Sequence, residues 1–226
     1  QAYARALAIA TALGGDLDIA RTLYNLGYLE YVQGDRTAAL AKYQEAARRF
    51  RAQDNAIALV TVLNGIGLIH ADEGRLADAL ALYQEALALG RQLGMENEIA
   101  MLTCNIGRLC ARQGDPAKAL ACFQEAIAIY RRIGNRVHLA TALDNAGEIL
   151  SQQEKTLDAL KAFEQAAVIQ QEVGDKPGLM RSLGNLADLY LKFNRQDDAL
   201  RACLLLEPLM RETGSPAAIA PILLYI

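Results

Sequence analysis

The apolar and polar positions of this chain repeat with a fixed period. When the sequence is shifted by 40 residues it overlays on itself, and one column then holds Gly27, Gly67, Gly107 and Gly147. Within each repeat, apolar residues recur at helical spacing, stop at a turn signal, and recur in a second amphipathic stretch. Each repeat is therefore predicted to be a helical hairpin.

Turn chemistry marks the break inside each hairpin. Glycine stands at the break in three repeats, and Glu154 and Asn194 occupy the same place in the last two. The sequence "GDP" at 114–116 supplies a glycine that ends one helix, and an N-cap aspartate and a first-turn proline that begin the next. By the same chemistry, Asp35 and Thr156 are expected to cap their own second helices.

These signals predict complete helices and partial helices at both ends of the chain. The complete ones are expected at 17–33, 36–53, 55–73, 76–93, 95–113, 116–133, 135–153, 156–173, 175–193 and 196–212.

The predicted fold is an all-α, right-handed α-solenoid that forms a single domain over residues 1–226. Its five complete hairpins span about 20–59, 60–99, 100–139, 140–179 and 180–219, with partial repeats at 1–19 and 220–226. Residues 1–13 align with the second half of a second helix, and Ser215 and Pro216 signal the start of a sixth unit. We therefore expect a fragment of a larger protein, whose exposed solenoid ends favour self-association.

Composition and charge exclude several classes of function. The net charge of −3 gives no bulk attraction to nucleic acid. No run of 18 apolar residues is present, so no interaction with a membrane is expected. The four cysteines show neither a CxxC spacing nor a neighbouring histidine pair, which excludes a zinc site and a disulfide framework. A reducing, cytoplasmic setting fits this usage.

No catalytic constellation or cofactor site emerges from the sequence. A phosphate loop, an HExxH motif, a nucleophile elbow and a plausible triad are all missing. His70 falls in a largely apolar column and is interpreted as a packing residue, whereas His138 is expected to be solvated. The chain is therefore predicted not to be an enzyme, and to need no cofactor or metal.

The glycine column predicts close packing. A glycine inside a helix costs about 1 kcal/mol relative to alanine, so its recurrence indicates a neighbour too close for a Cβ atom. Small residues recur on the second helices at Ala39, Ala79, Ala119, Ala159 and Ala199. These alanines are expected to form the close contact. Tyr43, Tyr83, Phe123 and Phe163, four residues later, are expected to fill the gaps between hairpins.

The same columns carry a family resemblance. Asn25 to Gly27, Gly34, Ala39, Tyr43 and Ala46 fall at the spacing of the tetratricopeptide repeat, whose usual unit has about 34 residues. The longer period resembles arrays of kinesin light chains, spindle-orientation adaptors, peptide-pheromone receptors of bacilli and sensor arms of bacterial signalling NTPases. The fifth repeat departs from the pattern, because Ala187 replaces the glycine and Cys203 the aromatic residue.

In tetratricopeptide folds the first helices line a concave face, and the resemblance places an asparagine column there. The column holds Asn25, Asn105, Asn145 and Asn185, whereas the second repeat has Gly65 with Asn64 displaced by one position. An amide both donates and accepts hydrogen bonds, which suits an extended peptide backbone. The alternative is that these amides bond across neighbouring first helices and hold the stack together.

Other residues of the same face give the expected groove a graded character. It begins with aromatic residues, continues with basic ones and ends with acidic ones that include Asp144. The candidate partner-binding residues outside the asparagine column are Tyr24, Tyr28, Arg108, Arg112, Glu148 and Asp188. Such a gradient would set the direction of a bound segment by matching opposite charges.

These observations favour a protein-interaction module that binds a peptide segment or a partner helix in its concave groove. The alternative is a regulatory sensor arm of a larger signalling protein, which binds a small effector or its own polypeptide. The expected partner in either case is not nucleic acid or membrane.

Overall fold

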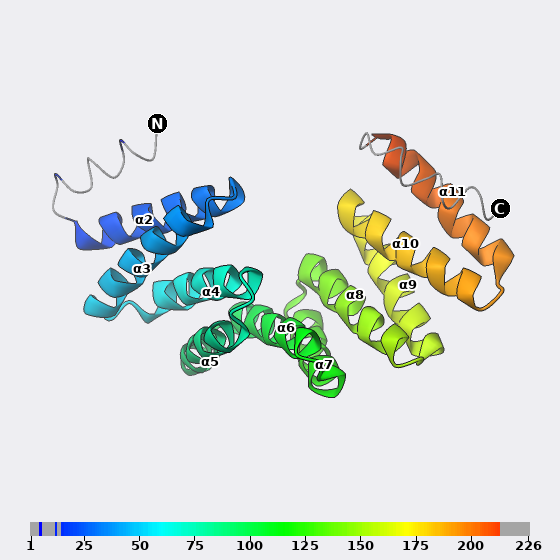
Figure 1. Ribbon diagram of the computed structural model, residues 1–226, viewed down its shortest axis with the longest axis horizontal. Coiled ribbons are helices and arrows are strands. Elements are labelled where there is room, and N and C mark those ends of the chain that lie inside the picture. Colours follow the sequence, from blue (N-terminus) through cyan, green and yellow to red (C-terminus); the bar gives the residue numbers. More distant parts are fainter. Residues whose placement is uncertain (1–4, 6–11, 13–14, 213–226) are drawn as a thin grey trace. The chain divides into compact units, whose positions relative to one another are not determined.

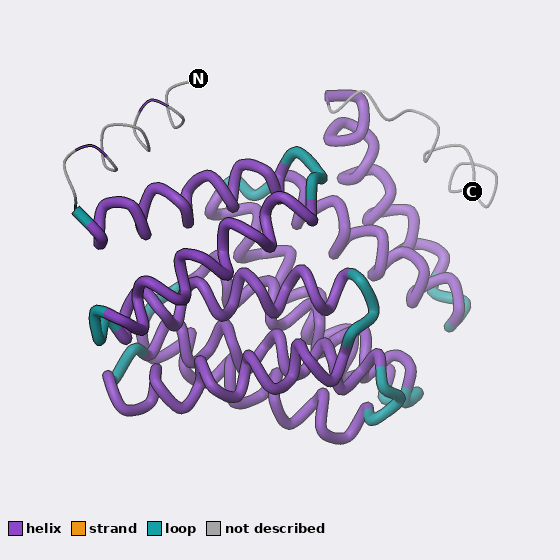
Figure 2. Tube along the Cα trace, turned by 60° about the vertical axis from the view of Figure 1, so that its left-hand side comes forward, coloured by secondary structure: helices purple, strands orange, loops and turns teal. Residues whose placement is uncertain are grey.

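The described part of the chain is built from helices joined by short turns. A computed structural model describes residues 5, 12 and 15–212, and this part contains ten helices and no strand (Figure 1). They are α2 (Asp16–Val32), α3 (Arg36–Ala52), α4 (Ala56–Asp72), α5 (Leu76–Leu93), α6 (Glu96–Arg112), α7 (Pro116–Ile133), α8 (Arg136–Gln152), α9 (Thr156–Val173), α10 (Lys176–Lys192) and α11 (Gln196–Glu212). Figure 2 shows how short the connecting loops are.

The predicted helix ranges are confirmed to within one residue at each end. Successive helices pack as antiparallel hairpins, α2 with α3, α4 with α5, α8 with α9 and α10 with α11 (Figure 1). The described residues therefore form the predicted all-α solenoid. The partial helices expected at residues 1–13 and after Ser215 lie outside the described residues.

The chain divides into two compact units, residues 1–109 and residues 110–226. The boundary lies inside α6. The first unit contains hairpins α2–α3 and α4–α5, and the second contains α7 and hairpins α8–α9 and α10–α11.

The helix-start signals are confirmed at two of the three positions named from sequence. Asp35 accepts a hydrogen bond from the Ala38 N–H, and Asp115 accepts one from the Lys118 N–H. The expectation for Thr156 was wrong. Lys155 occupies the N-cap position without a side-chain hydrogen bond, and Thr156 is already the first helical residue, so its hydroxyl cannot reach the N–H groups of the first turn.

The break inside each hairpin needs one residue in the left-handed conformation. Gly34, Gly74 and Gly114 adopt φ of 89°, 79° and 78° there. Glu154 and Asn194 adopt φ of 59° and 56° at the equivalent positions, so the backbone shape is kept where the glycine is not. A positive φ strains the backbone of glutamate, whereas glycine adopts it without strain.

The nearest neighbours of the glycine column are aromatic rings. A Cβ built on Gly27 would lie 2.8 Å from Cδ1 of Tyr43, and one built on Gly147 would lie 2.7 Å from Cε1 of Phe163. The close partner is thus the ring on the second helix of the same hairpin. The expectation that the alanines form this contact is met at Gly27, where the Ala39 carbonyl oxygen would lie 3.2 Å from the same Cβ, although the ring atoms lie closer.

The aromatic rings of the second helices also fill the space between consecutive hairpins, as Tyr43 does. A Cβ built on Gly65, in the first helix of the next hairpin, would lie 3.0 Å from Cε2 of the same ring. Tyr43 is 2% exposed and is therefore held between glycines of two consecutive hairpins. One ring thereby joins α2, α3 and α4.

Candidate functional site

Tyrosines gather on the first helix of the first unit. Tyr24, Tyr28 and Tyr31 lie at spacings of four and three residues on α2, which brings them to one side of the helix. The Tyr24 ring packs on the buried Tyr43 ring with their centroids 5.6 Å apart. Tyr28 is 57% exposed. We call Tyr24, Tyr28, Tyr31 and Arg108 the tyrosine face.

Polar contacts fix one edge of the tyrosine face. The Tyr31 hydroxyl donates to Oδ2 of Asp72 at 2.9 Å, and Nε of Arg36 lies 3.7 Å from the same oxygen. Burial and this hydrogen bond raise the pKa of Tyr31, and the positive charges of Arg36 and Arg108 oppose that rise. The exposed Arg108 on α6 is thus close enough to act on a tyrosine of α2.

The asparagine column is not uniform in the first unit. Asn25 is exposed, whereas Asn105 is only 9% exposed. Nδ2 of Asn105 donates to Oδ1 of Asn64 at 2.8 Å, and Nδ2 of Asn64 lies 3.9 Å from the Met101 sulfur. This pair ties α4 to α6, as the alternative interpretation of the column describes.

In the second unit the column is half-buried. Asn145 on α8 and Asn185 on α10 are both partly exposed. Nδ2 of Asn185 is inaccessible to solvent and has no hydrogen-bond partner among the described residues. Leaving such a donor unpaired costs about 1–3 kcal/mol.

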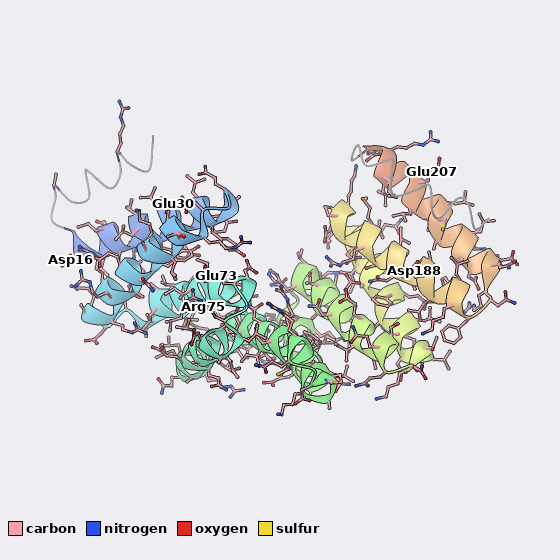
Figure 3. The ribbon with its side chains drawn as sticks, in the orientation of Figure 1. Asp16, Glu30, Glu73, Arg75, Asp188 and Glu207 are labelled. Carbon is pink, nitrogen blue, oxygen red and sulfur yellow. The ribbon has the colours of Figure 1, made fainter. Side chains whose placement is uncertain are left out.

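The remaining charged candidates are exposed. Arg112, Glu148 and Asp188 each have more than a third of their surface accessible to solvent. Asp188 is labelled on α10 in Figure 3. These three side chains keep their charges in contact with water.

Asp144, expected on the groove face, is instead fully buried, with 0% exposure. Its Oδ2 accepts from Nε2 of Gln170 at 2.7 Å and from Nη2 of Arg181 at 2.8 Å, and its Oδ1 accepts from the Ser182 hydroxyl at 2.5 Å. The expectation was wrong because partners on α9 and α10 surround the carboxylate. An acidic far end of the groove therefore lacks Asp144, whose charge is balanced by Arg181.

The sequence contains a signal for this network in two columns of the repeat. The column of Gln170 otherwise holds Phe50, Gly90, Tyr130 and Met210, and the column of Ser182 holds Val62, Leu102 and Ala142 in the three preceding repeats. A polar side chain in an otherwise apolar column of a solenoid requires a buried polar partner. The changes to polar residues at Gln170 and Ser182 lie within one repeat length of each other, so together they indicate a buried polar network.

The other chemistry-bearing residues carry structural roles. The His70 side chain is 12% exposed, in agreement with its interpretation as a packing residue, and burial lowers its pKa. None of the four cysteines, all of which lie in the described ranges, takes part in a disulfide. Within the described ranges no three His, Cys, Asp or Glu side chains converge as a metal site would require, and no helix is long and apolar enough to cross a membrane.

Comparison with known families gives one match. The tetratricopeptide-repeat model matches residues 58–132 and 138–202, which is more than half of the chain. A comparison with curated proteins found no match.

Solved structures share the fold at low sequence identity. BtubC (BKLC) from P. vanneervenii is 19% identical with a TM-score of 0.81, over 94% of this chain and 90% of that one. The apo form of RapI is 18% identical with a TM-score of 0.77, over 98% of this chain and 86% of that one. A Rap protein complexed with competence and sporulation factor is 17% identical with a TM-score of 0.74, over 87% of this chain. This chain spans 54% of that Rap protein.

Proposed function

Because this chain belongs to the tetratricopeptide-repeat family, we propose that it is a protein-interaction module that holds a peptide segment or a partner helix against its first helices. The observation that carries the proposal is the tyrosine face. Tyr28 is a large aromatic side chain that is 57% exposed beside two partly buried tyrosines. Aromatic side chains and arginine are enriched among the residues that dominate binding energy at protein interfaces.

The chemistry of this face defines the segment that it would hold. The tyrosine rings offer an apolar surface, and their hydroxyl groups offer hydrogen bonds. Arg108 offers a charge-assisted hydrogen bond to a carboxylate. The preferred ligand is therefore a segment that combines an apolar or aromatic residue with an acidic one.

The half-buried asparagines form a separate candidate surface within the second unit. Asn145 and Asn185 lie one repeat apart on α8 and α10. The exposed parts of these two amides would hydrogen-bond to the backbone of a ligand, because an amide can both donate and accept. Exposed Glu148 and Asp188 on the same two helices would favour a basic residue nearby.

A regulatory sensor arm is the second candidate. Its support is the shared fold with a Rap protein that was crystallised in complex with competence and sporulation factor, and of which this chain spans only 54%. Sequencing the gene on both sides of this region distinguishes the candidates, because a sensor arm requires an attached output domain.

The experiment selects peptides from a random displayed library on the wild-type chain and then titrates the selected peptide against variants. Tyr28→Ala and Arg108→Glu are expected to weaken binding by about 1–3 kcal/mol each. The matched controls are Phe193→Ala, which removes an aromatic side chain that is 47% exposed at the end of α10, and Arg132→Glu on α7. Equal binding by all four variants would show that the tyrosine face is not the site.

A further inference from the structure

An apolar groove lies away from the tyrosine face, in the second unit. It has a volume of about 560 Å³ and is lined by α9, α10 and α11. Leu179, Leu183 and Leu186 contribute from α10, Ala167 and Val168 from α9, and Leu205, Pro208 and Leu209 from α11. Its charged lining residues are Glu164, Lys176 and Glu212, and Lys176 donates to Glu212. We call it the α9–α11 groove.

The equivalent groove one repeat earlier is divided in two by a bridge of polar side chains. Between α7 and α9 it consists of two hollows of about 300 and 290 Å³ that share Arg131 and Gln165 in their lining, and Nη2 of Arg131 donates to Oε1 of Gln165 at 3.0 Å. Forty residues later, the same two positions hold Gln171 and Leu205. The α9–α11 groove has therefore exchanged a bridging polar pair for a glutamine facing a leucine.

A second substitution makes the edge of this groove apolar. At two adjacent positions on the second helix, the first four repeats place Gln44–Glu45, Gln84–Glu85, Gln124–Glu125 and Glu164–Gln165. The fifth repeat places Leu204 and Leu205 there, and each is 59% exposed. Exposed leucines at positions that are otherwise polar indicate a surface that a partner covers.

A following hairpin does not cover these positions. Glu164 and Gln165 stand at the same two positions of α9, and both are exposed although α10 and α11 come after them. The repeat geometry thus leaves the leucine pair open to solvent when the array continues. A further repeat therefore supplies no occupant for this surface.

We propose that the α9–α11 groove and the Leu204–Leu205 pair form a contact with a second copy of this chain. A two-fold contact uses the same patch on both copies, so the patch must offer both a protrusion and a recess. Leu204 does not line the groove and projects into solvent, whereas the groove beside it is open. Each copy presents a leucine to the other and receives one in return.

Charge supports an antiparallel pairing of two α11 helices. Asp198 lies six residues before Leu204, and Arg211 lies six residues after Leu205. An antiparallel arrangement centred on the leucine pair places Asp198 of each copy opposite Arg211 of the other. Within one copy, Asp198 pairs with Arg195 and Arg201, and Arg211 pairs with Glu207, whose position on α11 is labelled in Figure 3. The new pairs extend these existing ones across the contact.

The test is a concentration series by sedimentation equilibrium on the whole chain. The double variant Leu204→Gln and Leu205→Glu restores the polar pair that the first three repeats carry, so it is compatible with the fold. It is expected to raise the dissociation constant of the dimer about ten-fold or more, the effect of losing a central apolar contact. The control Leu157→Glu changes a leucine of α9 that is 71% exposed and outside the groove lining, and it should leave the constant unchanged.

Three outcomes would overturn the proposal. A wild-type chain that stays monomeric at every concentration leaves the groove to a different occupant, such as a small apolar ligand. A dimer that the double variant does not weaken uses another surface. In the antiparallel arrangement Arg211→Asp weakens the dimer and the added change Asp198→Arg restores it, and the absence of that rescue would refute this pairing. None of these outcomes bears on the tyrosine face.

Discussion

Replacement of Gly147 by alanine tests whether the aromatic ring fixes the approach of the two helices of a hairpin. The new Cβ atom would lie 2.7 Å from Cε1 and 2.9 Å from Cδ1 of Phe163. Phe163 is 2% exposed, and its neighbours in the core leave a rigid ring little room to move aside. The substitution is therefore expected to destabilise the chain, although alanine is the better helix former.

The size of the effect follows from two opposing terms. Alanine inside a helix is more stable than glycine by about 1 kcal/mol, whereas an overpacked core loses about 1–3 kcal/mol. Since contacts below 3.0 Å require something to shift, we take the upper part of that range, which leaves a net loss of about 1–2 kcal/mol. Gly184→Ala in α10 meets no atom within 4 Å and should gain the helix term alone, about 1 kcal/mol.

Urea unfolding followed by far-ultraviolet circular dichroism measures both variants, because the chain contains no tryptophan to report by fluorescence. The slope of free energy against urea must stay unchanged for the midpoints to be compared. A third variant, Phe163→Leu, removes the ring and completes a double-mutant cycle with Gly147→Ala. The loss caused by Gly147→Ala should be smaller in the leucine background.

Two results would refute this reasoning. If Gly147→Ala stabilises the chain as much as Gly184→Ala does, the ring yields and does not set the helix approach. If the loss is the same with phenylalanine and with leucine at position 163, the clash involves some other group.

Four further variants test other parts of the structure. Glu154→Gly should raise the free energy of unfolding by about 1–2 kcal/mol by releasing a left-handed backbone, which a rise in the urea midpoint would show. Asn105→Ala should lower it by about 1–3 kcal/mol because Oδ1 of Asn64 loses its donor, and an unchanged midpoint would contradict the tie between α4 and α6. Asp144→Ala should lower the free energy of unfolding by about 2–4 kcal/mol in the same assay, since buried polar partners lose their acceptor. Burial lowers the pKa of His70 below 6.5, so its contribution to stability is complete above that pH and is lost as the pH falls further; His70→Leu should make the urea midpoint less dependent on pH in that acidic range.

The sequence determined the repeat and the helices because these depend on local chemistry. Three local features carry this information, and each acts within a few residues. They are a residue with left-handed backbone at the break, an aspartate that caps the N–H three residues later, and apolar residues at the helical period. Thr156 shows the limit, because it is the first residue of α9 and the N-cap position belongs to Lys155.

The tertiary structure decided which side chains meet across helices. The group nearest to Gly147 is the ring of Phe163, because the reach of a side chain and not its position alone determines which atoms come closest. Asp144 became a buried centre because Ser182 and Arg181, close to one repeat length away, turn toward it. The asparagine column likewise contains a buried tie at Asn105 and an exposed side chain at Asn25, and only the neighbours in space distinguish them.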